Sequence, residues 1–140
     1  MRILGCFASH LHRVQQIVDV AISEGRKIFP LGRSMVNNVR IAQQLGILNL
    51  SSKDVYSIED IDQFAPGEIC IVCTGSQGEP NAALSLLANN NHRDLRVTSE
   101  DVVILSSHPI PGNERAVYRI IDRLTRMGCE VVHDGHELVH

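Results

Sequence analysis

The stretch Ile69-Cys70-Ile71-Val72-Cys73, followed at once by Thr74-Gly75-Ser76-Gln77-Gly78-Glu79-Pro80, decides the fold class. Its first five residues are all apolar, and such a continuous run indicates a strand covered on both faces, as in a parallel sheet. Residues 102–105 have the same character, so we expect them to be covered on both faces as well. The glycines, proline and hydroxyl residues after Cys73 indicate a loop that leads from this strand to a helix.

Strands and helices alternate on either side of this stretch. We predict strands at residues 2–7, 27–31, 69–73, 102–105 and 130–133, a short edge strand at 95–97 and an extended segment at 47–50. Helical spacing predicts helices at 11–22, 35–45, 82–89 and 116–127 and a small one that opens at Ser57, with Ser9 and Ser34 as N-caps. The alternation predicts an α/β fold, a doubly wound and mostly parallel sheet with helices on both faces, in a single domain over residues 1–140.

Composition narrows the class of protein. The chain has 140 residues, of which 44% are hydrophobic and 21% charged, and its formal net charge is -3. This balance argues against a stand-alone, charge-driven binder of nucleic acid or membranes, and no apolar run is long enough to span a bilayer. With no signal peptide, the four cysteines are expected to be buried thiols in a reducing, cytoplasmic compartment.

The loops that follow the predicted strands carry the residues with functional chemistry. They comprise residues 7–10, 32–34, 74–80 and 106–114, and they offer hydroxyls, amides, imidazoles and one guanidinium but only two carboxylates. In a parallel sheet these loops share one edge, and each leads into a helix N-terminus, which suits an anionic ligand and phosphate above all. The alternative is that the serines and glycines only cap helices, and the residues themselves leave both explanations open.

Known nucleotide and nucleophile motifs are absent from these loops. There is no G-x-G-x-x-G after the first strand and no G-x-x-x-x-G-K-[ST]. Thr74 stands where a G-x-S-x-G nucleophile elbow needs its first glycine, so Ser76 is interpreted as a turn hydroxyl. We therefore assign no catalytic residue to this chain.

Metal motifs are also incomplete. His10-x-His12 looks like the start of an H-x-H-x-D-H zinc signature, but valine and glutamine occupy the next two ligand positions. Cys70 and Cys73 lie three apart in one strand, so their side chains point to opposite faces and they are expected to be two buried thiols. The C-terminal histidines, His133, His136 and His140, are expected to form a solvated tail rather than a metal site. We predict no metal ligand and no cofactor in this chain.

The order and spacing of four segments resemble the β-CASP domain of bacterial ribonuclease J. These segments are FASHLHRVQQ at 7–16, GRSM at 32–35, TGSQGEP at 74–80 and PIPGNE at 109–114, and the resemblance covers nearly the whole chain. It implies a zinc-dependent, metallo-β-lactamase-fold exo- and endoribonuclease that processes and degrades RNA. In that family the β-CASP domain is inserted in the catalytic domain and closes over the RNA channel, while the zinc ligands lie in the catalytic domain.

The resemblance implies that this chain is an excised β-CASP domain without its own catalytic centre. Its expected partners are 5′-monophosphorylated single-stranded RNA and the metallo-β-lactamase catalytic domain of the same parent, and no membrane. The RNA-facing set carried over from the motifs is Ser9, His10, Arg13, Arg33, Ser34, Thr74, Gly75, Ser76, Gln77, Ser107, His108, Pro109, Gly112 and Asn113. Two other hypotheses remain: a free-standing phosphate- or nucleotide-binding α/β domain, and a structural module that exposes an apolar patch for a partner domain.

Overall fold

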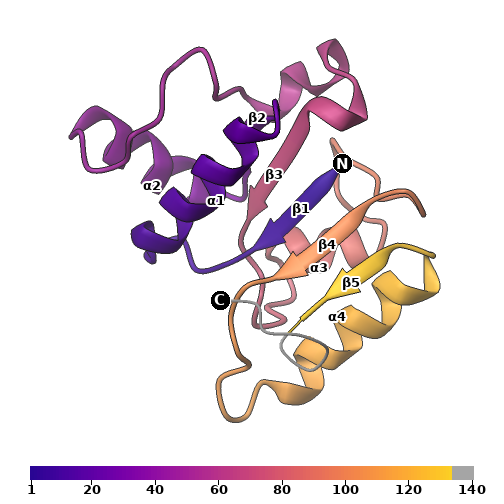
Figure 1. Ribbon diagram of the computed structural model, residues 1–140. Helices are drawn as coiled ribbons and strands as arrows, with labels where there is room; N and C mark the ends of the chain where they lie inside the picture. The colour runs from indigo at the N-terminus through magenta and orange to yellow at the C-terminus, as the bar shows by residue number, and fades with distance from the viewer. Residues whose placement is uncertain (134–140) are drawn as a thin grey trace.

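Strand β1 (Arg2–Gly5) lies at the centre of the sheet and pairs in parallel with a strand on each side. In the computed structural model, which describes residues 1–133, the sheet has five strands in the order β2-β3-β1-β4-β5 (Figure 1). The other strands are β2 (Lys27–Leu31), β3 (Ile69–Cys73), β4 (Val102–Leu105) and β5 (Glu130–Val132). Every pairing is parallel, which confirms the predicted α/β class.

Helices cover both faces of the sheet, as predicted. Helices α1 (Leu11–Ser23) and α2 (Arg33–Gln44) pack on one face, in a core that includes Cys70 and Val72 of β3. Helices α3 (Ala83–Ala88) and α4 (Glu114–Arg126) pack on the other, with Ile71 and Cys73. Two 3-10 helices, η1 (Ile58–Gln63) and η2 (Pro66–Glu68), precede β3. Within residues 1–133, no helix has the length and apolar character to cross a membrane.

The four cysteines are buried free thiols, as predicted. Cys70 belongs to the core beneath α1 and α2, whereas Cys73 belongs to the core on the opposite face. Burial raises the pKa of Cys70 to about 12, so this thiol stays protonated at neutral pH. The side chains of the pair therefore point away from each other, as the three-residue spacing in a strand requires.

Both predicted serine caps are wrong. Helix α1 begins one residue after His10, whose backbone N–H bonds to the Phe7 carbonyl, and no side chain caps it. Helix α2 begins at Arg33, so Ser34 lies inside its first turn. The reason is Gly32, whose φ of 96° turns the chain from strand to helix within a single residue.

Two predicted extended segments are not strands. Residues 47–48 form a bend after the turn that closes α2, where the N–H groups of Ile47 and Leu48 both bond to the Ala42 carbonyl, and residues 49–50 are irregular. Residues 95–97 are irregular, although Leu95 and Val97 are buried in the core. The alternation of apolar and polar residues here results from burial of one side of a loop and not from strand pairing.

Strand β4 is covered on one face only, which contradicts the expectation from its apolar run. Val103 and Leu105 are buried in the core against α3 and α4. Val102 and Ile104 alternate with them, are half-buried, and belong to neither core cluster. Figure 1 shows no helix over this side of β4 and β5. The apolar run predicted a second covering layer that residues 1–133 do not supply.

The expectation of a solvated C-terminal tail is wrong for His133. This side chain is only 7% exposed, and its ring meets Tyr118 of α4 edge-on, with ring centroids 5.9 Å apart. His136 and His140 lie outside the described residues. The residue that follows β5 is therefore buried against α4 and not released to solvent.

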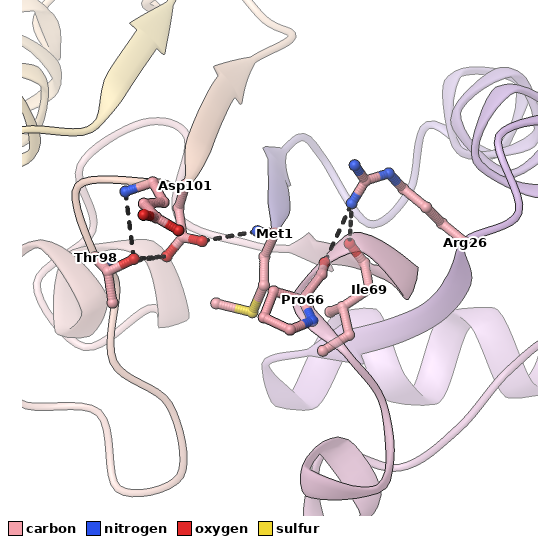
Figure 2. Close-up of polar contacts among 7 residues, drawn as sticks. Met1, Arg26, Pro66, Ile69, Thr98 and Asp101 are labelled. Atoms are coloured by element: carbon pink, nitrogen blue, oxygen red, sulfur yellow. Dashed lines mark hydrogen bonds and ion pairs between the residues drawn. The ribbon is translucent and has the colours of Figure 1, made fainter.

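The amino-terminal edge of the sheet is held by charged groups that bond to loops (Figure 2). The N-terminal ammonium of Met1 donates to Asp101 Oδ1 at 2.8 Å, and Asp101 Oδ2 accepts from the Thr98 N–H at 2.8 Å. On the other side of β1, Arg26 Nη1 donates to the Ile69 carbonyl at 2.9 Å. Asp101 is only 3% exposed, so this carboxylate depends on the donors that surround it.

We expect Asp101→Asn to lower the free energy of unfolding by about 1–3 kcal/mol, because it leaves the Met1 ammonium without its buried counter-charge. Urea denaturation measures this change. The matched control is Asp122→Asn, which breaks an exposed 3.1 Å pair with Arg126 and should cost under about 0.5 kcal/mol. Equal losses in the two variants would contradict the structural role of Asp101.

Candidate functional site

A cleft of about 610 Å³ opens at the carboxyl-terminal edge of β1, β2 and β3. Strand β1 sends its helix to one face of the sheet and β3 sends its helix to the other, so their loops diverge and leave a crevice. The cleft is lined by residues of three strand-to-helix loops and of α2: Cys6, Phe7, Ala8, Arg33, Ser34, Asn37, Asn38, Thr74, Gly75, Ser76, Glu79 and Ala82. Five of the predicted RNA-facing residues, Arg33, Ser34, Thr74, Gly75 and Ser76, are therefore brought together.

The first turn of α2 supplies the positive end of the cleft. Arg33 and Ser34 are both exposed there, and the first backbone hydrogen bond within this helix runs from the Val36 N–H to the Gly32 carbonyl. The N–H groups before Val36 thus have no partner within the helix and remain available to an acceptor. Arg33 makes no ion pair with any described residue, and a helix N-terminus beside a free guanidinium favours an anion.

Two lining residues on α2 were missed by the sequence analysis. Asn37 and Asn38 lie one turn beyond Arg33 and Ser34, on the same side of the helix. The Asn38 side-chain amide donates to the Ala8 carbonyl at 3.1 Å and so ties α2 to the loop after β1. The i, i+4 spacing from the GRS segment was the signal that could have found both.

The floor of the cleft is neutral. Cys6 is 2% exposed, and burial raises the pKa of its thiol to about 11 although the nearby Arg13 opposes the shift. The thiol is therefore protonated at neutral pH and a poor nucleophile. Ser76 is also buried, and its hydroxyl oxygen accepts a hydrogen bond from the Ser107 hydroxyl at 2.9 Å.

The Gln77 side chain forms hydrogen bonds within the protein and does not line the cleft. Its side chain is buried, its Nε2 donates to the His108 carbonyl at 2.8 Å, and its Oε1 accepts from the Ile110 N–H at 2.7 Å. The Asn113 side-chain amide donates to the same oxygen at 3.3 Å. Gln77 therefore clamps the loop after β3 to the loop after β4, and its amide is fully used in doing so.

The loop after β4 lies beside the cleft but does not line it. Its five predicted residues, Ser107, His108, Pro109, Gly112 and Asn113, are all absent from the cleft wall. Ser107 and Asn113 instead join the network around Gln77. Gly78 adds a backbone contact: a Cβ built there would approach the Ala116 carbonyl carbon of α4 to 2.8 Å. The two loops are thus packed together as one unit.

The predicted residues of the first segment are scattered. Ser9 and His10 are exposed at the start of α1 and do not line the cleft. Arg13 lies one turn further along α1 and lines a different groove, beside the open face of β4. Helical geometry separates these residues, because the turn after His10 carries Arg13 away from the cleft.

The residues that the structure describes do not fit a zinc ion. Within residues 1–133, no group of three or more His, Cys, Asp or Glu side chains is arranged to hold a metal. A zinc site needs three or four such donors converging on one point. No chemical step through zinc is derived from this chain.

We expect Gln77→Leu to lower the free energy of unfolding by about 1–3 kcal/mol, because it breaks the hydrogen bonds that the buried Gln77 amide makes with the Ile110 N–H and the His108 carbonyl. Urea denaturation measures the loss, and hydrogen exchange should show faster exchange confined to residues 106–114. Gln44→Leu, at an exposed position of α2, is the control and should change stability by less than about 0.5 kcal/mol. Unchanged exchange in residues 106–114 would disprove the clamp.

Known proteins that are similar to this chain come from the family that its motifs resemble. A family profile described as "Ribonuclease J, beta-CASP domain" matches residues 1–124. Ribonuclease J of Mycobacterium tuberculosis is 44% identical over 138 residues, which are 99% of this chain and 25% of that protein. Ribonuclease J of Thermus thermophilus is 42% identical over 134 residues, or 96% of this chain and 23% of that protein. Ribonuclease J2 of Bacillus subtilis is 35% identical over 130 residues, or 93% and 23%.

These matches run along nearly the whole chain. The chain spans about a quarter of the length of the curated relatives that it matches. The family profile includes all four segments on which the resemblance rests, from the loop after β1 to the start of α4. The chain therefore belongs to the β-CASP domain family of ribonuclease J.

Proposed function

We propose that this chain is the RNA-binding β-CASP domain of a ribonuclease J-like exo- and endoribonuclease that processes and degrades RNA in the cytoplasm. In this proposal the cleft holds part of a 5′-monophosphorylated single strand and forms one wall of the RNA channel. The chemistry of hydrolysis, zinc included, belongs to a metallo-β-lactamase catalytic domain outside this chain. Family membership supports a role in a ribonuclease J, and the cleft supports the choice of ligand.

The observation that supports RNA as the ligand is the position of Arg33 at the N-terminus of α2, at one end of the cleft. A phosphate there would receive charge-assisted hydrogen bonds from the guanidinium and from backbone N–H groups. The hydroxyls of Ser34 and Thr74 and the amide of Asn37 add neutral partners along the wall. These groups suit a phosphodiester chain, whose oxygens only accept hydrogen bonds.

The electrostatics of the cleft also explain how a chain of net charge -3 serves a polyanion. Arg33 is the one cation among the lining residues, and Glu79 is the one carboxylate. Such a wall orients a strand but attracts it weakly, because affinity for nucleic acid grows with the number of phosphates that cations neutralise. Strong binding therefore needs further cations from the catalytic domain.

We expect Arg33→Ala to weaken binding of a 5′-monophosphorylated RNA oligonucleotide about tenfold, the loss of one charge-assisted hydrogen bond. The slope of log affinity against log salt should become shallower by about one. Fluorescence anisotropy at low salt measures both quantities. Arg119→Ala is the control, since it removes the same charge from an exposed position on α4.

These binding measurements distinguish an RNA-binding domain from a domain that binds a free nucleotide or phosphate. Equal weakening by the two arginine variants would show that only net charge matters and would remove Arg33 from the site. Tight binding of one free mononucleotide, with no effect of RNA, would favour a phosphate- or nucleotide-binding α/β domain instead.

We expect the chain alone to show no turnover of 5′-monophosphorylated RNA with added Mn²⁺ or Zn²⁺, because its described residues offer no converging set of metal donors. A gel assay with end-labelled RNA tests this. The Gln77→Leu variant, purified in parallel, serves as a control for contaminating nuclease. Cleavage that survives stringent purification and falls with Arg33→Ala would contradict the assignment of catalysis to another domain.

A further inference from the structure

The side of β4 that faces away from α4 forms an open apolar surface. The parallel register places Leu4 of β1, Ile104 of β4 and Val132 of β5 in one row across three strands. All three side chains are half-buried, and Ile104 and Val132 belong to neither core cluster. Val102 continues this surface one step toward the amino-terminal edge. Within residues 1–133, the α1–α2 layer therefore ends at β1, and the next two strands have no cover on this side.

A groove of about 660 Å³ runs between this open surface and α1. Leu4 and Ile104 form its floor, and Ile17 and Val20 of α1 form one wall. Val20 is 59% exposed although it lies on the apolar wall of the groove. Val20, Leu4 and Ile104 thus gather in one groove, and exposed apolar patches of this kind mark interaction sites.

Three buried polar atoms that make no hydrogen bond line the same groove. Arg2 Nε, Arg13 Nε and Ser106 Oγ are buried and have no hydrogen-bond partner among the described residues. The one other such atom in residues 1–133 is Ser85 Oγ, on the opposite face of the sheet. Buried polar groups in folded proteins are nearly always hydrogen-bonded. Arg2 Nε still faces a Glu24 carboxylate oxygen, but Arg13 Nε and Ser106 Oγ point to acceptors that arrive from outside.

The charges of the groove define these acceptors. Arg2 Nε and Arg26 Nε lie 3.7 Å and 3.8 Å from the same Glu24 carboxylate oxygen. Asp19 Oδ1 accepts from the Gln15 amide at 2.9 Å. Arg13 has no carboxylate partner in the part of the chain that the structure describes. A ligand of the groove should therefore carry a carboxylate that reaches Arg13.

We infer that this groove seats an amphipathic helix from a part of a full-length ribonuclease J outside this chain, with an apolar stripe on Leu4 and Ile104 and a flanking carboxylate on Arg13. A helix is the element that covers a parallel sheet in this class of fold, and the apolar run of β4 is typical of a strand covered on both faces. The relatives are about four times as long as this chain, so they contain the polypeptide needed. This inference goes beyond the proposed function and does not depend on RNA binding by the cleft.

The test compares this chain alone with a chimera. In the chimera, this chain replaces the matching 138 residues of the Mycobacterium tuberculosis relative. Ile104→Cys is introduced in both, and its rate of modification by iodoacetamide is measured by mass spectrometry. The native thiols are buried, so they react slowly and leave the new one readable. We expect modification at position 104 to be at least tenfold slower in the chimera.

Leu45→Cys is the matched control, since this side chain is 68% exposed at the end of α2, away from the groove. Its rate should agree within about twofold between the two proteins. Equal rates at position 104 in chain and chimera would overturn the inference. So would protection in the isolated chain that grows with protein concentration, which would assign the groove to a second copy. Protection of the isolated chain by a single-stranded oligouridylate would assign it to RNA and would overturn the inference too.

A second measurement tests the inference without the chimera, in case the chimera does not fold. Overlapping 25-residue peptides from the same relative, outside the matched region, are tested for binding to this 140-residue chain by fluorescence anisotropy. We expect a peptide with a carboxylate beside an apolar stripe to bind, and expect Ile104→Asp and Arg13→Ala each to weaken it at least fivefold while Leu45→Asp has no effect. Absence of any peptide with this dependence would overturn the inference.

Discussion

The parallel pairing of β1 along both of its edges is the constraint on which the rest of the molecule depends. Its backbone bonds to β3 on one side and to β4 on the other, residue for residue from Arg2 to Gly5. Because all the strands run the same way, their carboxyl ends meet at one edge and the loops that follow lie together. The cleft forms where those loops part toward opposite faces. The order of the strands thus selects which loops build the cleft.

The polar residues of the strand-to-helix loops have two different roles. Arg33, Ser34 and Thr74 line the cleft. Gln77 and Asn113 belong to an internal network that fixes one loop against another. The donors and acceptors of the buried Gln77 amide are already hydrogen-bonded within the protein, so this amide cannot also hold a ligand. The motifs therefore encode the shape of the site as well as its chemistry.

The uncovered side of strand β4 is the surface on which we propose that another polypeptide segment packs. Its four residues are all apolar, but only Val103 and Leu105 are covered. The groove beside α1 then combines a bare apolar floor with Arg13 Nε, a buried donor without a partner. Both features are unfavourable in water and favourable against a second polypeptide. The cleft and the groove lie on different parts of the sheet, so ligand binding and domain packing need not compete.

The sequence by itself determined the α/β class, the alternation of elements and the placement of the loops on one edge, because apolar periodicity reports local structure and burial directly. It also identified Arg33 and Ser34, which stand at a strand-to-helix junction. Only the tertiary structure decided that Arg13 leaves the cleft, that Gln77 is a clamp and that residues 95–97 are not a strand. These outcomes depend on which elements become neighbours, and on a single backbone angle at Gly32 that moves a helix start. Periodicity carries no information about either.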